Sequence, residues 1–223
     1  MKNYKWFIAL MIMAIVLGIF VFTWNTTINL LNTLDILDHT AHGILICGGN
    51  VLGILCCTLF ALAFGLGALR MESGRKERLP LLLLALGEVG CIIGDFGWLI
   101  YNIVFFNSGY SEAMISSSIA LQALYHIMVA IFIIAAIWLA VVNKSTLMRI
   151  GAALFVIGKT MLAVVSLFAL PIIMSYINDF DNERWYLRMI YPLTMGVWHF
   201  VVNLCLYVPI IVMAHKAGKA CAA

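Results

Sequence analysis

The chain has 223 residues, of which 65% are hydrophobic and only 10% are charged, and its mean hydropathy is +1.08. This composition excludes an ordinary soluble domain and predicts a membrane protein. The formal net charge of +3 gives no reason to expect a nucleic-acid partner, because the basic residues are spread over several short loops. Six cysteines without a C-x-x-C pair do not indicate a disulfide framework.

Six apolar runs are long enough to cross about 30 Å of hydrocarbon, which takes about 20 helical residues. The first run follows the basic start MKNYKW and is too long for the apolar core of a cleaved signal peptide, so we expect it to be retained. No loop is long enough for a soluble domain. The sequence therefore predicts an all-α, polytopic bundle of six transmembrane helices, a single transmembrane domain over 1–223, with approximate helices at 6–24, 41–69, 80–106, 113–142, 147–175 and 188–214.

Lysine and arginine residues indicate the orientation of these helices. If the chain crosses six times, one side collects Lys2, Lys5, Arg70, Arg75, Lys76, Arg78, Lys144, Arg149, Lys216 and Lys219. The other side has Arg184 and Arg188 together with most of the loop carboxylates. Because the basic side is normally cytoplasmic, both termini are expected in the cytoplasm and the protein in the cell membrane, as a multi-pass protein.

A cluster of metal-ligand residue types precedes the second predicted helix, in the segment DILDHTAH. Asp35, Asp38, His39 and His42 have the spacing of one helical face. Two carboxylates and two imidazoles at that spacing can bind a divalent ion such as zinc. The alternative is that the acids stabilise the N-terminal end of the helix through its dipole, while the histidines lie at the membrane interface.

The third predicted helix contains the segment GEVGCIIGDFGW, residues 87–98, which places two carboxylates inside an apolar span. Glu88 and Asp95 are almost two helical turns apart and share one face with Cys91, Trp98 and Asn102. A parallel stripe of small residues, with the GxxxG spacing that permits close helix contact, is formed by Gly87, Gly90, Gly94 and Gly97. This pattern predicts that the third helix is the central, buried helix of the bundle.

Five ionisable side chains fall near the middle of the predicted bilayer, where each costs about 2.5–3.5 kcal/mol on insertion scales. They are Glu88, Asp95, His126, Lys159 and His199, and they come from four helices. A rise of about 1.5 Å per residue places all five between roughly 10 and 21 Å from the cytoplasmic edge. We therefore predict one midplane polar site.

Further polar residues are expected to support this site. Gln122 precedes His126 by one helical turn, and His199 precedes Asn203 by the same spacing. Such neighbours can hydrogen-bond a histidine and fix its tautomer. Trp98 and Asn102 lie on the same helical face as the two carboxylates.

The charges of the midplane residues suggest a coupled proton. Two carboxylates with one lysine leave a formal charge of minus one, which in a low dielectric favours at least one mobile proton. A structural alternative is that Lys159 only neutralises Asp95 or Glu88, with the histidines linking helices by hydrogen bonds.

Intramembrane acids and histidines are typical of proton relays, so the leading hypothesis is a small proton- or ion-coupled transporter or a membrane ligand-binding protein. Two cofactor hypotheses are also open. His126, His199 and one carboxylate could ligate a divalent metal in an intramembrane hydrolase, or the two histidines could be the axial ligands of a b-type haem. A non-catalytic subunit of a membrane complex is a further alternative. The expected partners are the lipid bilayer and a small molecule, proton or ion.

Overall fold

The structure is a computed structural model that describes residues 4–34, 36–71, 75–105, 112–169 and 185–220. All regular elements within these ranges are helices. The long ones are α1 (Tyr4–Thr33), α2 (His39–Leu69), α3 (Arg78–Phe105), α4 (Glu112–Val142), α5 (Thr146–Val164) and α7 (Trp185–Ala220). Each of the six is long and apolar enough to cross a membrane. The all-α fold with six membrane-length helices is thus confirmed.

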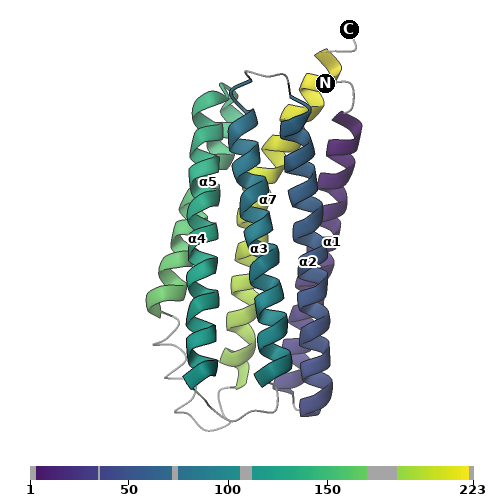
Figure 1. Cartoon of the computed structure of the whole chain (residues 1–223), viewed down its shortest axis with the longest axis vertical. Helices are drawn as coiled ribbons and strands as arrows, with labels where there is room; N and C mark the ends of the chain where they lie inside the picture. The colour runs from purple at the N-terminus through teal and green to yellow at the C-terminus, as the bar shows by residue number, and fades with distance from the viewer. Residues whose placement is uncertain (1–3, 35, 72–74, 106–111, 170–184, 221–223) are drawn as a thin grey trace.

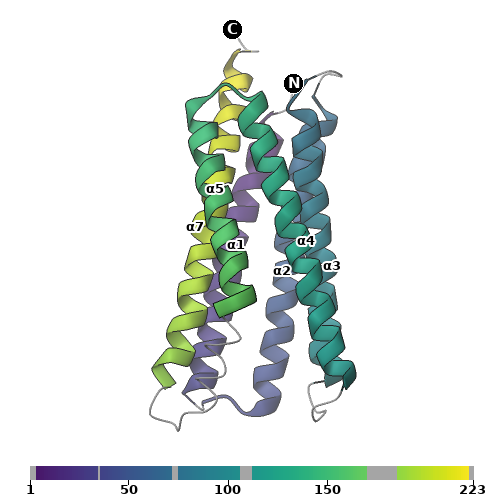
Figure 2. The ribbon, with the colours of Figure 1, turned by 90° about the vertical axis from the view of Figure 1, so that its left-hand side faces the viewer.

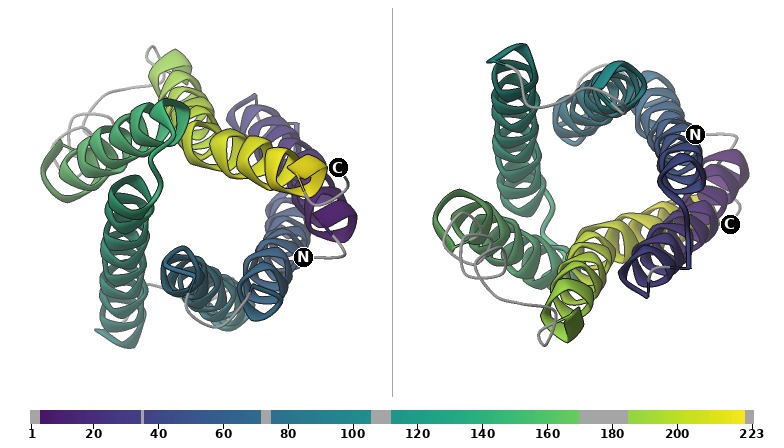
Figure 3. Two further views of the ribbon diagram at one scale, coloured as in Figure 1. Left: turned by 90° about the horizontal axis from the view of Figure 1, so that it is seen from above. Right: turned by 90° about the horizontal axis from the view of Figure 1, so that it is seen from below.

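The six helices run along the long axis of the molecule, and both chain ends lie at the same end of it (Figures 1 and 2). Each helix packs mainly against the helices before and after it in the sequence, and α7 packs against α1 as well as α5. Seen along the long axis, the helices therefore follow one another around a ring (Figure 3).

Helix α3 is one member of this ring, so the expectation of a central, buried third helix is wrong. Its main neighbours are α2 and α4. An outward stripe with helical spacing is exposed and apolar, and consists of Leu79, Leu86, Val89, Ile93, Phe96, Ile100 and Ile103. A face of this kind suits contact with lipid chains. The carboxylate face therefore lines the inside of the ring, while the opposite face of the same helix looks outward.

The glycine stripe of α3 is occupied by side chains of α4. A Cβ atom at Gly87 would lie 2.9 Å from the ring of Phe132, and one at Gly90 would overlap Met128. One at Gly97 would overlap Leu121. The stripe thus permits the close helix contact that its spacing predicts, and the partner is α4.

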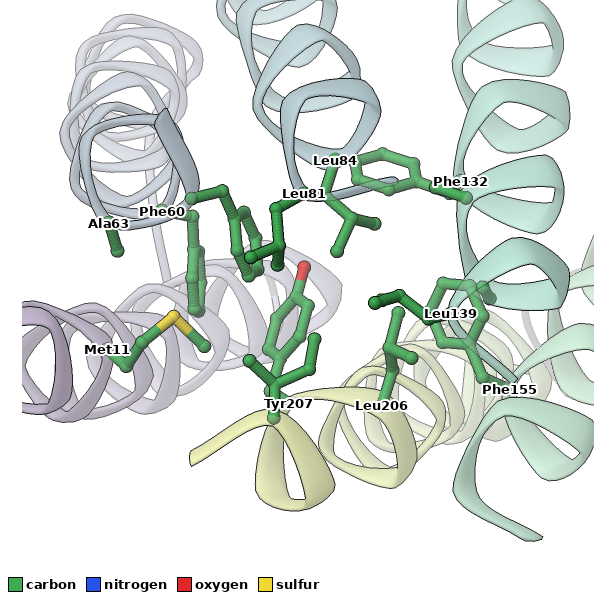
Figure 4. Close-up of a cluster of buried hydrophobic side chains, with 14 of the residues drawn as sticks. Met11, Phe60, Ala63, Leu81, Leu84, Phe132, Leu139, Phe155, Leu206 and Tyr207 are labelled. Atoms are coloured by element: carbon green, nitrogen blue, oxygen red, sulfur yellow. The ribbon is translucent and has the colours of Figure 1, made fainter. Parts of the chain in front are cut away.

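Apolar side chains from the six long helices cluster inside the ring (Figure 4). Every long helix contributes, among others through Met11, Phe60, Leu84, Leu139, Phe155 and Leu206, which are all buried. These residues come from the beginnings of α1, α3 and α5 and the later parts of α2, α4 and α7. We call this cluster the apolar core. It closes one end of the ring.

Two helices depart most from their expected limits. Helix α1 continues past residue 24 to Thr33, and this extension contributes the buried Ile28. Helix α5 ends at Val164 and is followed by the π-helical segment η1 (Val165–Ala169). The expected end of that span at residue 175 lies outside the described residues.

The close packing of α5 on α7 leaves no room for a side chain at Gly151. A Cβ at Gly151 would overlap the backbone carbonyl of Cys205 on α7, which cannot move without shifting the helix. We expect Gly151→Ala to lower the stability by about 1–3 kcal/mol. Gly65→Ala is the control, since its Cβ would meet no atom closer than 3.9 Å. Thermal unfolding of the two purified variants measures the difference, and equal melting temperatures would contradict this packing.

Candidate functional site

A cavity of about 290 Å³ lies inside the ring, next to the apolar core. Four of the five predicted midplane residues line it, namely Glu88, Asp95, Lys159 and His199. They come from three helices that are not consecutive in sequence, α3, α5 and α7. We call this space the central cavity. Its volume is at the lower end of the range for small-molecule sites.

Glu88 lies at the end of the central cavity next to the apolar core and is only 3% exposed. The hydroxyl of Tyr207 on α7 donates a 2.7 Å hydrogen bond to its Oε1 atom. The Tyr207 ring packs against the rings of Phe60 and Phe64 of α2, with centroids 4.5 and 5.6 Å away. Because the tyrosine is packed on both rings, the carboxyl group of Glu88 has a fixed partner across the ring of helices.

Asp95 lies two turns further along α3, at the contact with α2. Its carboxylate is accommodated by Gly53, where a Cβ atom would approach Oδ2 to 2.8 Å. Its partner on α2 is the thiol of Cys57, which is 3.9 Å from Oδ2. A thiol is a weak donor, and this distance is long. Asp95 therefore lines the cavity, and the protein compensates little of the cost of burying its carboxylate.

Lys159 is 6% exposed and lines the central cavity from α5. Its Nζ atom lies 5.8 Å from the centroid of the Phe132 ring and 5.6 Å from that of Phe155. Within the described ranges, it has no hydrogen bond and no ion pair with a carboxylate. The aromatic contacts compensate only part of the cost of burying an ammonium group.

His199 joins α7 to α4. Its Nε2 atom is 3.1 Å from the hydroxyl of Tyr125, which also lines the central cavity. Asn203, one turn further along α7, lines the cavity as well, and so does Trp98 of α3. Two of the predicted supporting residues are thus placed at the site.

His126 does not line the central cavity, unlike the other four midplane residues. Its Nδ1 atom is 2.7 Å from the backbone carbonyl of Gln122, and its Nε2 atom is 3.1 Å from Oγ of Ser166. The Gln122 side chain is exposed, so its contribution to His126 comes from the backbone. His126 therefore connects α4 to the π-helical segment η1. Asn102, a further predicted supporting residue, is half-buried and does not line the central cavity.

A second cavity of about 300 Å³ adjoins the central one between α1, α2 and α7. Its lining is largely apolar and includes Ile15, Val21 and Phe200. The two cavities share His199, Asn203, Tyr207, Phe60 and Cys56. These five residues form the wall between the two spaces.

The described residues do not form a metal centre. Among them no group of three or more histidine, cysteine, aspartate and glutamate side chains could hold a metal ion. His126 does not line the central cavity, and both of its ring nitrogens already have partners. The geometry therefore does not fit a metal or haem site built on His126 and His199.

The segment before α2 is described only in part. Asp35 and the side chain of His39 lie outside the described residues, so the metal site predicted there stays a prediction. Asp38 caps helix α2, because its Oδ1 atom accepts a 2.6 Å hydrogen bond from the backbone N–H of Ala41. This contact places the Asp38 carboxylate at the N-terminal end of α2, where the helix-dipole alternative also placed it, and adds a capping hydrogen bond that was not predicted.

Replacement of Asp38 separates capping from metal binding. If Asp38 acts as a cap, Asp38→Ala is expected to lower stability by about 1 kcal/mol, while Asp38→Asn retains most of it. Thermal unfolding with and without added zinc measures both effects. Zinc stabilisation of the original chain that disappears in Asp38→Asn would instead assign the residue to a metal site.

Two residues at the site, Tyr207 and Cys57, were missed by the sequence prediction. Tyr207 follows His199 and Asn203 with helical spacing, and this periodicity could have revealed it. Cys57 of α2 lines the cavity as well, and was not predicted to do so.

Comparison of the chain with protein-family models, with curated proteins and with solved structures finds no match.

Proposed function

We propose that this chain is an integral membrane protein that binds a small polar solute in the central cavity and couples this binding to a proton or ion. It would act as a small transporter or as a membrane ligand-binding protein. The observation that carries the proposal is the convergence of Glu88, Asp95, Lys159 and His199 on one cavity. Packing alone would favour closely paired charges, but Lys159 makes no hydrogen bond and no close ion pair with a carboxylate in the described structure.

The distribution of lysine and arginine supports the placement of both chain ends in the cytoplasm. The apolar core then lies on the cytoplasmic side of the central cavity. A solute would reach the cavity from the opposite side, and its release into the cytoplasm would require the apolar core to open. This arrangement supports a conformation in which the apolar core closes the cavity on the cytoplasmic side only. Transport by alternating access requires a conformation of this kind.

The charge of the cavity supports coupling. Two carboxylates and one lysine leave one negative charge that has no counter-charge on the lining. In a space with little water, such a charge is most easily balanced by a bound cation or proton. Solute and proton would then occupy the same site at the same time.

Liposomes that contain the purified protein and an internal pH indicator test this function. Addition of pooled small amino acids, quaternary ammonium compounds and sulfonates, which do not cross lipid without a carrier, is expected to move protons only when the protein is present. Asp95→Asn and Glu88→Gln are the decisive variants, and Lys144→Met, at an exposed position outside the cavity, is the control. Proton movement that is the same in all of these proteins would contradict the proposal.

A further inference from the structure

Lys159 marks the end of the central cavity that is suited to an anionic group. More than nine-tenths of the side chain is buried, and within the described residues its ammonium group makes no hydrogen bond and no close ion pair with a carboxylate. The Phe132 and Phe155 rings hold the ammonium group in place without neutralising it. Asn203 lines the same cavity and adds an amide that can donate hydrogen bonds. A carboxylate entering the cavity would gain a charge-assisted contact that the protein itself leaves unmade.

Asp95 marks the other end, which is suited to an ammonium group. Its partner from the protein is the Cys57 thiol at 3.9 Å, which leaves its carboxylate oxygens able to accept stronger hydrogen bonds. The aromatic side chains of Trp98, one turn further along α3, and of Tyr125 line the same cavity. Carboxylates and aromatic faces together are typical surroundings for bound ammonium groups.

We propose that the solute is a small zwitterion, whose ammonium group binds Asp95 and whose carboxylate binds Lys159. This inference rests on the proposed function, because it names the solute of the same cavity. A solute with both charges satisfies both protein groups, whereas an amine leaves Lys159 unpaired and a carboxylate leaves Asp95 unpaired. Unmet buried charges are strongly unfavourable, so the selectivity follows from the site.

The geometry also limits the size of the zwitterion. The central cavity of about 290 Å³ equals the share of roughly ten liquid waters. An amino acid of about ten non-hydrogen atoms or fewer fits this space.

Binding to the purified full-length protein tests the proposal with defined probes. The zwitterions are glycine, 4-aminobutanoate and 6-aminohexanoate, and n-butylamine and butanoate are the matched single-charge compounds. Calorimetry is expected to show at least one zwitterion binding about tenfold or more tighter than either single-charge compound. Asp95→Asn should weaken n-butylamine but not butanoate, and Lys159→Met should weaken butanoate but not n-butylamine.

The other outcomes are also informative. If n-butylamine binds as tightly as the best zwitterion, the site recognises cations and the zwitterion proposal is wrong, although the proposed function stands. If no zwitterion binds, the proposal is likewise wrong. The proposed function is judged separately, by solute-driven proton movement in liposomes with the wider pool. Circular dichroism of both variants ensures that a loss of binding is not a loss of folding.

Discussion

Replacing Lys159 by methionine is expected to abolish binding of the solute without lowering the thermal stability of the protein. The side chain is buried, and within the described structure it is held by two aromatic rings rather than by a carboxylate. Methionine has a similar length and no charge, so it removes the cost of burying an ammonium group. That cost is about 2.5–3.5 kcal/mol near the centre of a bilayer.

The structural alternative predicts the opposite sign. If Lys159 served to neutralise Glu88 or Asp95, its removal would leave a buried charge without its partner and cost about 3–5 kcal/mol. Thermal unfolding in detergent therefore decides between a binding lysine and a structural one. Lys144→Met, at an exposed position, should change neither stability nor binding. A melting temperature lowered by many degrees in Lys159→Met would contradict a binding role.

Neutralising Asp95 is expected to lower solute affinity, whereas neutralising Glu88 is expected to remove the coupled proton. Asp95 has the weaker protein partner, so Asp95→Asn should lower solute affinity by about 10- to 100-fold, the worth of one charge-assisted hydrogen bond. Glu88 is already bonded to Tyr207, and glutamine can still accept that bond. Glu88→Gln should therefore bind solute nearly as before but lose the proton that accompanies it.

Tyr207→Phe provides the control for this division of roles. It removes the hydroxyl that donates to Glu88 while keeping the ring against Phe60 and Phe64. A buried carboxyl group without its donor should destabilise the protein by about 1–3 kcal/mol.

Calorimetry in two buffers of different ionisation enthalpy counts the protons taken up with the solute. An equal count in the original chain and in Glu88→Gln would contradict the proton-carrying role of Glu88.

Hydropathy predicted most of this fold because a membrane-length apolar helix is a property of local sequence. The arrangement of the helices was not predictable in the same way. The glycine stripe of α3 correctly indicated a close helix contact, but a stripe alone cannot tell a central helix from one member of a ring. The outward stripe that includes Leu86, Ile93 and Ile100 was available as a signal of a second, lipid-facing side.

The sequence predicted which ionisable residues lie at the same depth in the membrane, and residues at one depth can line the same cavity if their side chains also point inward. Glu88, Asp95, Lys159 and His199 share both a depth and an inward direction, and they meet. His126 shares the depth, but Ser166 of η1 holds its ring away from the cavity. Depth follows from counting residues along a helix, whereas direction depends on how each helix is rotated against its neighbours.

The native cysteines test most directly whether a polar cavity exists between the helices in the membrane. Cys91 lines the cavity between the two carboxylates, whereas Cys205 packs against the apolar core and lines neither cavity. Two variants would each keep one of these cysteines and replace the other five by alanine. A small, water-soluble, charged thiosulfonate reagent is added to membranes, and labelling is measured over time.

We expect that Cys91 is labelled much faster than Cys205, that a bound solute protects it, and that Asp95→Asn removes this protection. Equal, slow labelling of both cysteines would mean that the space between α2, α3, α4, α5 and α7 is closed to water. The ionisable side chains would then be structural, and the proposed binding site would be contradicted.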